Sequence, residues 1–279
     1  MNKNEMKIPS WIRHYRMFAV LLLSLALAAC NGDSHDDMGM TSQNDVAVPV
    51  ELSASQEVPS NASSATATGT LTVNSESGTL SGSITASGMM VTMAHIHESK
   101  AGSNGSVVIP LEVDGNMISV PAGTMLTSAQ VDSMLVGDYY VNLHSALYAG
   151  GEIRGQIAPS GVEVSVIALS GDNEVPPVME AGSGTAYVTL NRSSSMLSIN
   201  IATATDTAAT AAHIHGGLAG ENGDVLLPLV QDTSDASLFS VSSVVDQEVI
   251  DAIDADGAYL NVHTTANPTG EIRGQISAE

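Results

Sequence analysis

Histidine is the residue type in this chain whose placement most directly points to chemistry. Six of the eight histidines lie in two short motifs, A-H-I-H and Y-x-N-x-H, and each motif occurs twice. These six are His95, His97, His144, His213, His215 and His263. Residues two apart on a strand point to the same side, so His95 and His97 share a face. If the two motif strands of a copy are neighbours, their three imidazoles meet on one sheet surface, with opposed Cβ atoms about 5 Å apart.

Three neutral imidazoles suit copper or zinc and leave a coordination position open. Copper(II) has the higher intrinsic affinity for nitrogen ligands. The alternative is that the histidines only hydrogen-bond backbone and carboxylate groups at strand ends. Spacing alone does not decide between them. The metal hypothesis predicts that the chain binds about two copper or zinc ions.

A third repeated motif, G-E-I-R-G-Q-I, adds charged groups to the same surface. On a strand, Glu152 and Arg154 share a face in the first copy, and Glu271 and Arg273 do so in the second. We expect these four residues to support the histidines from outside the ligand set, and we favour a structural role for the arginines over anion binding. Serine and threonine are abundant, but none lies in a nucleophile-elbow motif. Catalytic residues are therefore not predicted, and a non-enzymatic role is favoured over an enzymatic one.

The motifs belong to a unit of domain size that occurs twice. His213 follows His95 by 118 positions, and Glu271 follows Glu152 by 119. The units span about residues 47–158 and 162–278, so only a short linker separates them and we expect them to touch. Alternation of polar and apolar residues with period two predicts about eight short antiparallel strands per unit. The predicted fold class is therefore all-β, with two tandem Greek-key sandwich or barrel domains.

Each unit also contains one segment with helical spacing. The first, Thr127–Val136, opens with Thr127 and Gln130 at the spacing of a capping box. The second, Ser243–Ile253, opens with Ser243 and Asp246 at the same spacing, and its aliphatic residues fall on one face. One short helix per domain is therefore expected.

The N-terminal region has the pattern of a bacterial lipoprotein leader. Cations precede the apolar run Met17–Ala28, which ends at the tetrad L-A-A-C closing on Cys30, the only cysteine. Residues 1–29 are expected to be removed, with Cys30 lipidated by fatty acids such as palmitate and 30–46 forming a flexible acidic tether. Each buried methylene contributes about 0.8 kcal/mol to membrane binding. The alternative is an ordinary secretory signal with an incidental cysteine. Asn31 resembles an outer-membrane sorting signal, so the predicted location is the outer membrane of the cell envelope, on its periplasmic or surface face.

Composition narrows the class of partner. The formal net charge is −22, with 8 Lys plus Arg against 30 Asp plus Glu. Such a chain repels phosphate backbones, so no nucleic-acid partner is expected, while cations are attracted. Hydrophobic residues make up 43%, enough for packed cores despite the acidity. A single cysteine excludes an intrachain disulfide and a thiolate zinc cluster.

On the A-H-I-H, N-G, Y-x-N-x-H and G-E-I-R-G-Q-I motifs, both units resemble the chordin-type domain family, CHRD. The resemblance implies a β-sandwich domain found in bacterial secreted proteins and in an animal extracellular antagonist of growth factors, with no established catalytic activity. Glu98, after His97, departs from the glycine that usually follows, whereas Gly216 in the second copy keeps it. The H-x-H strand and the later V-H also resemble parts of copper/zinc superoxide dismutase. That family's bridging histidine, zinc-loop cluster and disulfide have no counterpart here.

Three functions are compatible with these features. The first is a lipid-anchored, non-catalytic CHRD binding module with a copper or zinc site per domain or an unidentified protein partner. The second is a superoxide dismutase-like or other metal-handling redox protein. The third is a purely structural or adhesive surface protein whose histidines stabilise loops.

Overall fold

The computed structural model describes residues 44–179 and 182–277. The predicted leader, Cys30 and most of the tether lie outside these residues. Within the described part of the chain, no helix combines the length and the apolar character needed to cross a membrane.

Two sheets of nine strands each make up the described structure, one sheet per repeat. The first contains β1 (Asp45–Ser53), β2 (Thr66–Asn74), β3 (Leu80–Ser87), β4 (Met93–Glu98), β5 (Ser106–Pro110), β6 (Glu112–Asp114), β7 (Met117–Ser119), β8 (Tyr139–His144) and β9 (Ile153–Gln156). The second contains β10 (Val162–Ser170), β11 (Ser183–Asn191), β12 (Met196–Ala204), β13 (Ala209–Gly216), β14 (Val225–Pro228), β15 (Val230–Gln231), β16 (Leu238–Val244), β17 (Ala258–Thr264) and β18 (Ile272–Ile276). The tandem all-β fold is confirmed, with nine strands per domain rather than about eight.

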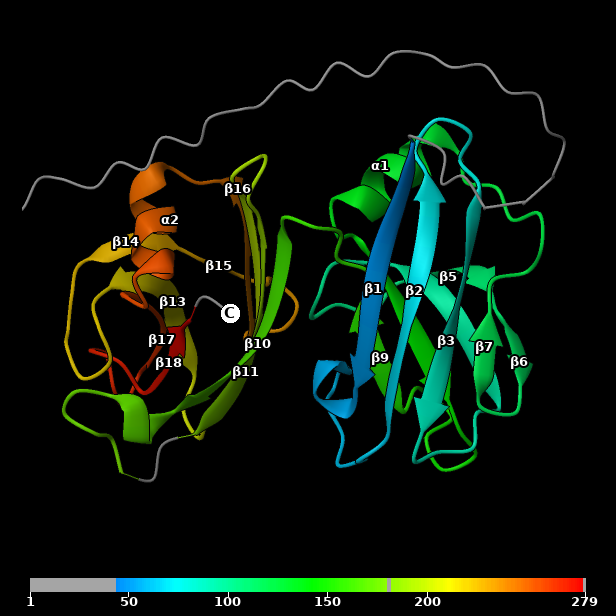
Figure 1. Ribbon diagram of the computed structural model, residues 1–279. Coiled ribbons are helices and arrows are strands. Elements are labelled where there is room, and N and C mark those ends of the chain that lie inside the picture. Colours follow the sequence, from blue (N-terminus) through cyan, green and yellow to red (C-terminus); the bar gives the residue numbers. More distant parts are fainter. Residues whose placement is uncertain (1–43, 180–181, 278–279) are drawn as a thin grey trace, which may run out of the picture. The chain divides into compact units, whose positions relative to one another are not determined.

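Each sheet curls into a nearly closed barrel (Figure 1). The strand order in the first is β5-β4-β8-β9-β1-β2-β3-β7-β6, and the second repeats it strand for strand. The neighbours β9–β1 and β3–β7 are joined through crossovers, as in Greek-key connections. This topology places the strands that carry the histidines and the arginine, β4, β8 and β9, side by side.

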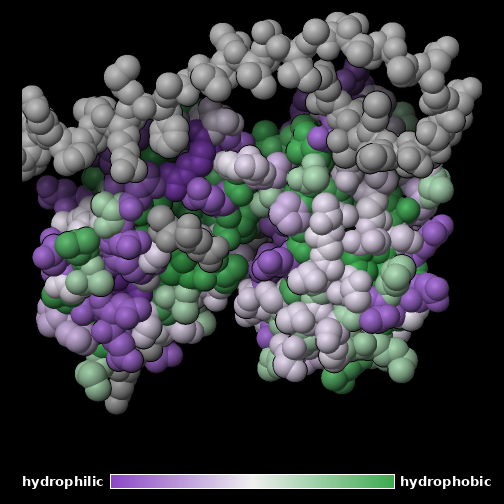
Figure 2. All heavy atoms as spheres, in the orientation of Figure 1, coloured by the Kyte–Doolittle hydropathy of each residue, from purple (hydrophilic) through white to green (hydrophobic). Residues whose placement is uncertain are grey.

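Period-two alternation builds the two cores. In β1, Val48, Val50 and Leu52 are buried and the residues between them are exposed. The outward faces of β2 and β3 are dominated by threonine and serine, which gives the first domain the pale, weakly polar surface seen in Figure 2. One apolar cluster fills each barrel. A strand that buries one face and exposes the other fixes its own register, because a slip by one residue would expose the apolar set.

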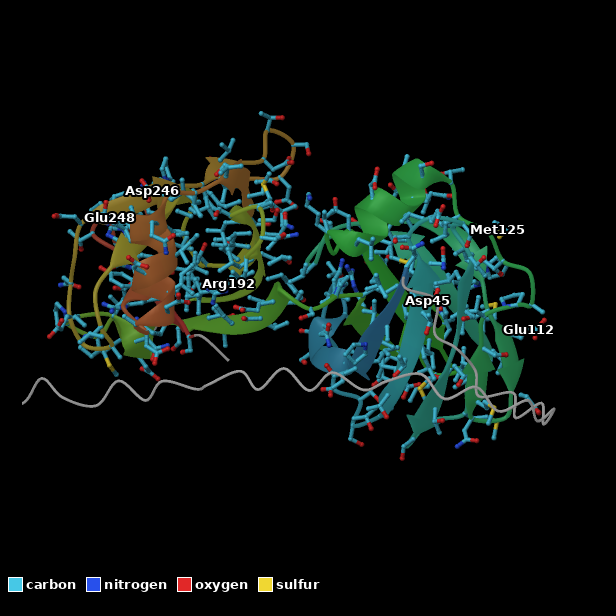
Figure 3. All side chains as sticks on the ribbon, turned by 45° about the horizontal axis from the view of Figure 1, so that its top comes forward. Asp45, Glu112, Met125, Arg192, Asp246 and Glu248 are labelled. Carbon is cyan, nitrogen blue, oxygen red and sulfur yellow. The ribbon has the colours of Figure 1, made fainter. Side chains whose placement is uncertain are left out.

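The predicted helix of the first domain is confirmed and that of the second begins later than expected. Helix α1 (Ser128–Leu135) starts after Thr127, which forms a capping box with Gln130. Helix α2 (Gln247–Asp254) starts after Asp246, whose side chain accepts from the Val249 N–H. Figure 3 shows Asp246 and Glu248 at this end of the helix. Ser243 does not cap it, because Ser243 belongs to β16 and pairs there with Leu197.

Candidate metal centre

The histidine strands are direct neighbours in both domains. In the first, β4 pairs with β8 so that His95 lies opposite Asn142, and β9 brings Arg154 opposite the same asparagine. In the second, His213 lies opposite Asn261, which is paired in turn with Arg273. Two adjacent strands therefore supply the imidazoles, and the third supplies a guanidinium.

The three imidazoles of each domain converge. One ring nitrogen from each of His95, His97 and His144 lies within 4.8 Å of the others, and the same holds for the trio of the second domain, His213, His215 and His263. His95 Nδ1 is 3.2 Å from His144 Nε2. His213 Nδ1 is 3.0 Å from His263 Nε2. This spacing suits three ligands around one small cation.

Backbone carbonyls assign the protons of two rings in each trio. His97 Nδ1 lies 3.0 Å from the Gly105 oxygen and His144 Nδ1 lies 3.1 Å from the Ala149 oxygen. A carbonyl only accepts, so both Nδ1 atoms carry hydrogen and both Nε2 atoms present lone pairs. His97 Nε2 is buried and has no hydrogen-bond partner among the described residues. A buried acceptor without a hydrogen-bond partner has the chemistry of a metal ligand.

The second domain repeats these contacts atom for atom. His215 Nδ1 donates to the Gly223 oxygen over 3.0 Å, and His263 Nδ1 donates to the Pro268 oxygen over 3.1 Å. His215 Nε2 is again buried without a partner in the described structure. The Nδ1 of the third ring in each trio, His95 or His213, faces a neighbouring Nε2 that only accepts, so it donates its proton there. A bound cation would take the place of that proton.

Burial favours the neutral form of four of these rings. It lowers the pKa of His97 and His144 below the ordinary 6.5, and the charged forms of nearby histidines lower them further. Burial also lowers the pKa of His213 and His263. Because metal binding needs the unprotonated ring, a lowered pKa extends the binding-competent form to more acidic conditions.

An aromatic ring and a guanidinium stack behind the site. Tyr140 lies parallel to His97, with ring centroids 4.8 Å apart, and the Arg154 guanidinium carbon is 3.4 Å from the Tyr140 centroid. Gly105 links the layers, because its N–H donates to the Tyr140 hydroxyl while its carbonyl accepts from His97. Tyr259 and Arg273 repeat this arrangement behind His215. Such layers orient a ligand ring and hold its tautomer.

The arginine face of the sheet is covered, and this differs from the expected open surface. Arg154 is only 1% exposed. Its guanidinium donates to the backbone oxygens of Ser103 and Lys100 and to Gln156 Oε1. These hydrogen bonds attach the loop 99–105 to the sheet. The polar face of the sheet is therefore buried beneath the loop, and its polar groups are hydrogen-bonded to it.

The two glutamates of the G-E-I-R-G-Q-I motifs hydrogen-bond to other parts of the structure than the histidines do. Glu152 Oε1 accepts from the Ser63 hydroxyl. Glu271 accepts from the Gly182 N–H and the side chains of Thr264 and Asn267. Neither carboxylate hydrogen-bonds a histidine of the described chain; both bind loops at the strand ends.

A buried carboxyl that the motif analysis did not select lies beside the sheet instead. Glu57 is 4% exposed, and its Oε2 accepts from Asn142 Nδ2 over 3.3 Å. Its Oε1 and the Asn142 Oδ1 lack partners among the described residues. Burial raises the pKa of Glu57 to about 7, although the charge of Arg154 opposes the rise. Glu174 and Asn261 repeat the pair. The only signal in the sequence was the twofold occurrence of E-V-P, 85 residues before the asparagine in the first domain.

Comparison with known proteins agrees with the repeat. The family model described as "CHRD domain" matches residues 48–157 and 166–276. Chordin from Xenopus laevis is 29% identical over 157 residues, covering 51% of this chain and 17% of that protein. Chordin from Danio rerio is 27% identical over 157 residues, with the same coverage. The chain thus spans about a sixth of the length of these curated relatives, and no solved structure matches it.

Proposed function

The chain belongs to the CHRD domain family of binding modules, and on that premise we propose that it is a non-catalytic binding protein that holds one copper or zinc ion on the three histidines of each domain. The observation that supports this is the pair of fixed Nε2 lone pairs in each trio. One ring nitrogen from each histidine of a trio lies within 4.8 Å of the other two. In each trio one of the fixed Nε2 atoms is buried and has no hydrogen-bond partner among the described residues.

The donor set defines the metal class. Three imidazole nitrogens with no thiolate and no carboxylate suit copper(II) or zinc(II), and copper(II) has the higher affinity for nitrogen ligands. A trio leaves the fourth position for water or for a group from a partner. The chain's own residues orient the rings: Gly105 and Ala149 set two tautomers, and Tyr140 with Arg154 fixes the plane of His97.

Metal titration tests the proposal. We expect calorimetry with zinc(II) or copper(II) on the mature chain to show about two ions per chain. The double variant His213→Ala/His215→Ala should bind about one ion, since removing two of three ligands should weaken a site by at least about 100-fold. His35→Ala, which removes a histidine outside the motifs, is the control and should keep both sites. Absence of uptake by the unmodified chain, with a lower melting temperature for the double variant, would instead assign the histidines to loop stabilisation.

We also propose that the protein acts in the cell envelope, anchored by lipid on Cys30. The support is the basic leader, the apolar run Met17–Ala28 and the placement of the only cysteine at the end of L-A-A-C. Labelled palmitate should be incorporated into the mature protein, and the labelled protein should fractionate with membranes. Cys30→Ser should abolish labelling, and Ser34→Ala should not. Equal membrane association of the labelled and unlabelled forms would contradict the anchor.

A further inference from the structure

The two histidine sites differ at one neighbouring position. β4 begins with Met93, which strand parity places on the same side of the sheet as His95 and His97. The register sets Met93 directly opposite His144. At the matching position of the second domain, Ala211 lies opposite His263. The first domain therefore presents a thioether where the second presents only a methyl group.

Met93 does not have the burial expected of a methionine that packs in an apolar core. Met93 is 48% exposed, and Met90, just before the strand, is 83% exposed. Alanine occupies both matching positions in the second domain, Ala208 and Ala211. Methionine ordinarily fills gaps in apolar cores, whereas Met93 is half exposed and is paired with a residue of the histidine trio. Directly opposed residues have Cβ atoms about 4.5–5.5 Å apart. Three rotatable bonds then let the Met93 sulfur approach the side of the trio occupied by His144.

We propose that the site of the first domain selects copper(I), with Met93 as a thioether ligand added to His95, His97 and His144. Thioether sulfur is a soft ligand that favours copper(I), while nitrogen ligands alone suit copper(II) and zinc(II). The site of the second domain, with Ala211 in place of the methionine, is the nitrogen-only member of the pair. This inference rests on the proposed function, because it takes both trios to be metal sites.

The test uses the mature full-length chain in two forms that each keep one trio. His213→Ala/His215→Ala keeps the first site and His95→Ala/His97→Ala keeps the second. Copper(I), held reduced under anaerobic dithionite, is titrated in competition with bicinchoninate, and zinc(II) in competition with a fluorescent chelator. We expect the first-site protein to bind copper(I) at least about tenfold more tightly than the second-site protein, with similar zinc(II) affinities.

Two substitutions locate the preference at Met93. Met93→Leu in the first-site protein should weaken copper(I) binding by about tenfold and leave zinc(II) binding unchanged, because leucine keeps the volume and removes the sulfur. Met125→Leu is the matched control: Met125 is also exposed, but it forms an isolated bridge with Thr79, the residue before β3, and is not paired with β4 or β8. Ala211→Met in the second-site protein should raise its copper(I) affinity.

The outcomes separate this inference from the proposed function. If neither protein binds zinc(II), copper(I) or copper(II), both fail together. If both bind zinc(II) and Met93→Leu leaves copper(I) affinity unchanged, the trios remain metal sites and the role of Met93 is overturned. Retained zinc(II) binding by Met93→Leu also shows that the variant is folded.

Discussion

Replacing Arg154 by methionine is expected to lower the free energy of unfolding of the first domain by about 3–5 kcal/mol. The guanidinium is buried, and it satisfies the backbone oxygens of Ser103 and Lys100 together with the side-chain oxygen of Gln156. Each buried acceptor left without a donor costs about 1–3 kcal/mol. Methionine keeps the length of the aliphatic stem but offers no donor, so the loop 99–105 loses its attachment to the sheet.

The same substitution should also affect the orientation of the histidine rings in the first domain. Gly105 ends the loop and holds both His97 and the Tyr140 hydroxyl, so its release frees the plane and tautomer of the His97 ring. We therefore expect weaker metal binding at the first site and unchanged binding at the second. Hydrogen exchange followed by mass spectrometry measures the effect domain by domain, with peptides from the loop expected to exchange first.

Arg192→Met is the matched control. Arg192, labelled in Figure 3, makes two ion pairs, 2.8 Å to Glu163 and 2.6 Å to Asp254, but its side chain is 28% exposed. Partly solvated pairs contribute about 0–1 kcal/mol each, so this change should cost far less than Arg154→Met despite removing more ion pairs. Equal losses would show that the buried guanidinium is no more important for stability than the one at the surface.

The parts of the structure that follow from local pattern were predictable from the sequence. Strand parity puts His95 and His97 on one face whatever surrounds them, and the recurrence of each motif about 118 residues later predicts a second domain with the same strands. The capping box at Thr127 was also predictable, because Thr127 and Gln130 are three residues apart and their contact needs no tertiary partner.

The parts that depend on tertiary pairing were not predictable. Ser243 has the spacing of a cap, yet pairing with β12 keeps it in a strand. Periodicity shows that Arg154 points away from the apolar core, but it does not show whether a loop covers it. The Glu57–Asn142 pair joins residues that only the folded chain brings together. A contact of this kind leaves no periodic pattern in the sequence. The same glutamate–asparagine pair occurs in the second domain, however, so the repeated E-V-P motif indicates a structural role for its glutamate.

Changing Glu57 to glutamine is expected to stabilise the first domain at pH 8 by about 1–2 kcal/mol and to change little at pH 5. When Glu57 is ionised, its Oε1 and the Asn142 Oδ1 are two buried acceptors without a donor. A protonated carboxyl can donate to the amide oxygen, and a glutamine Nε2 can do so at any pH. Burial accordingly raises the pKa of Glu57 from 4.5 to about 7.

The sign of the pH dependence follows from this rise. The folded state holds the proton more tightly than the unfolded chain, so the contribution of Glu57 is fully present below about pH 4.5 and is lost as the pH rises through about 7. Unfolding of the metal-free protein by urea, followed at pH 5 and pH 8, should show this fall, and Glu57→Gln should reduce it. Glu51→Gln, at an exposed position of β1, is the control and should leave the profile unchanged. If Glu57→Gln instead destabilises the domain equally at both values, the carboxyl is ionised throughout and held by the charge of Arg154.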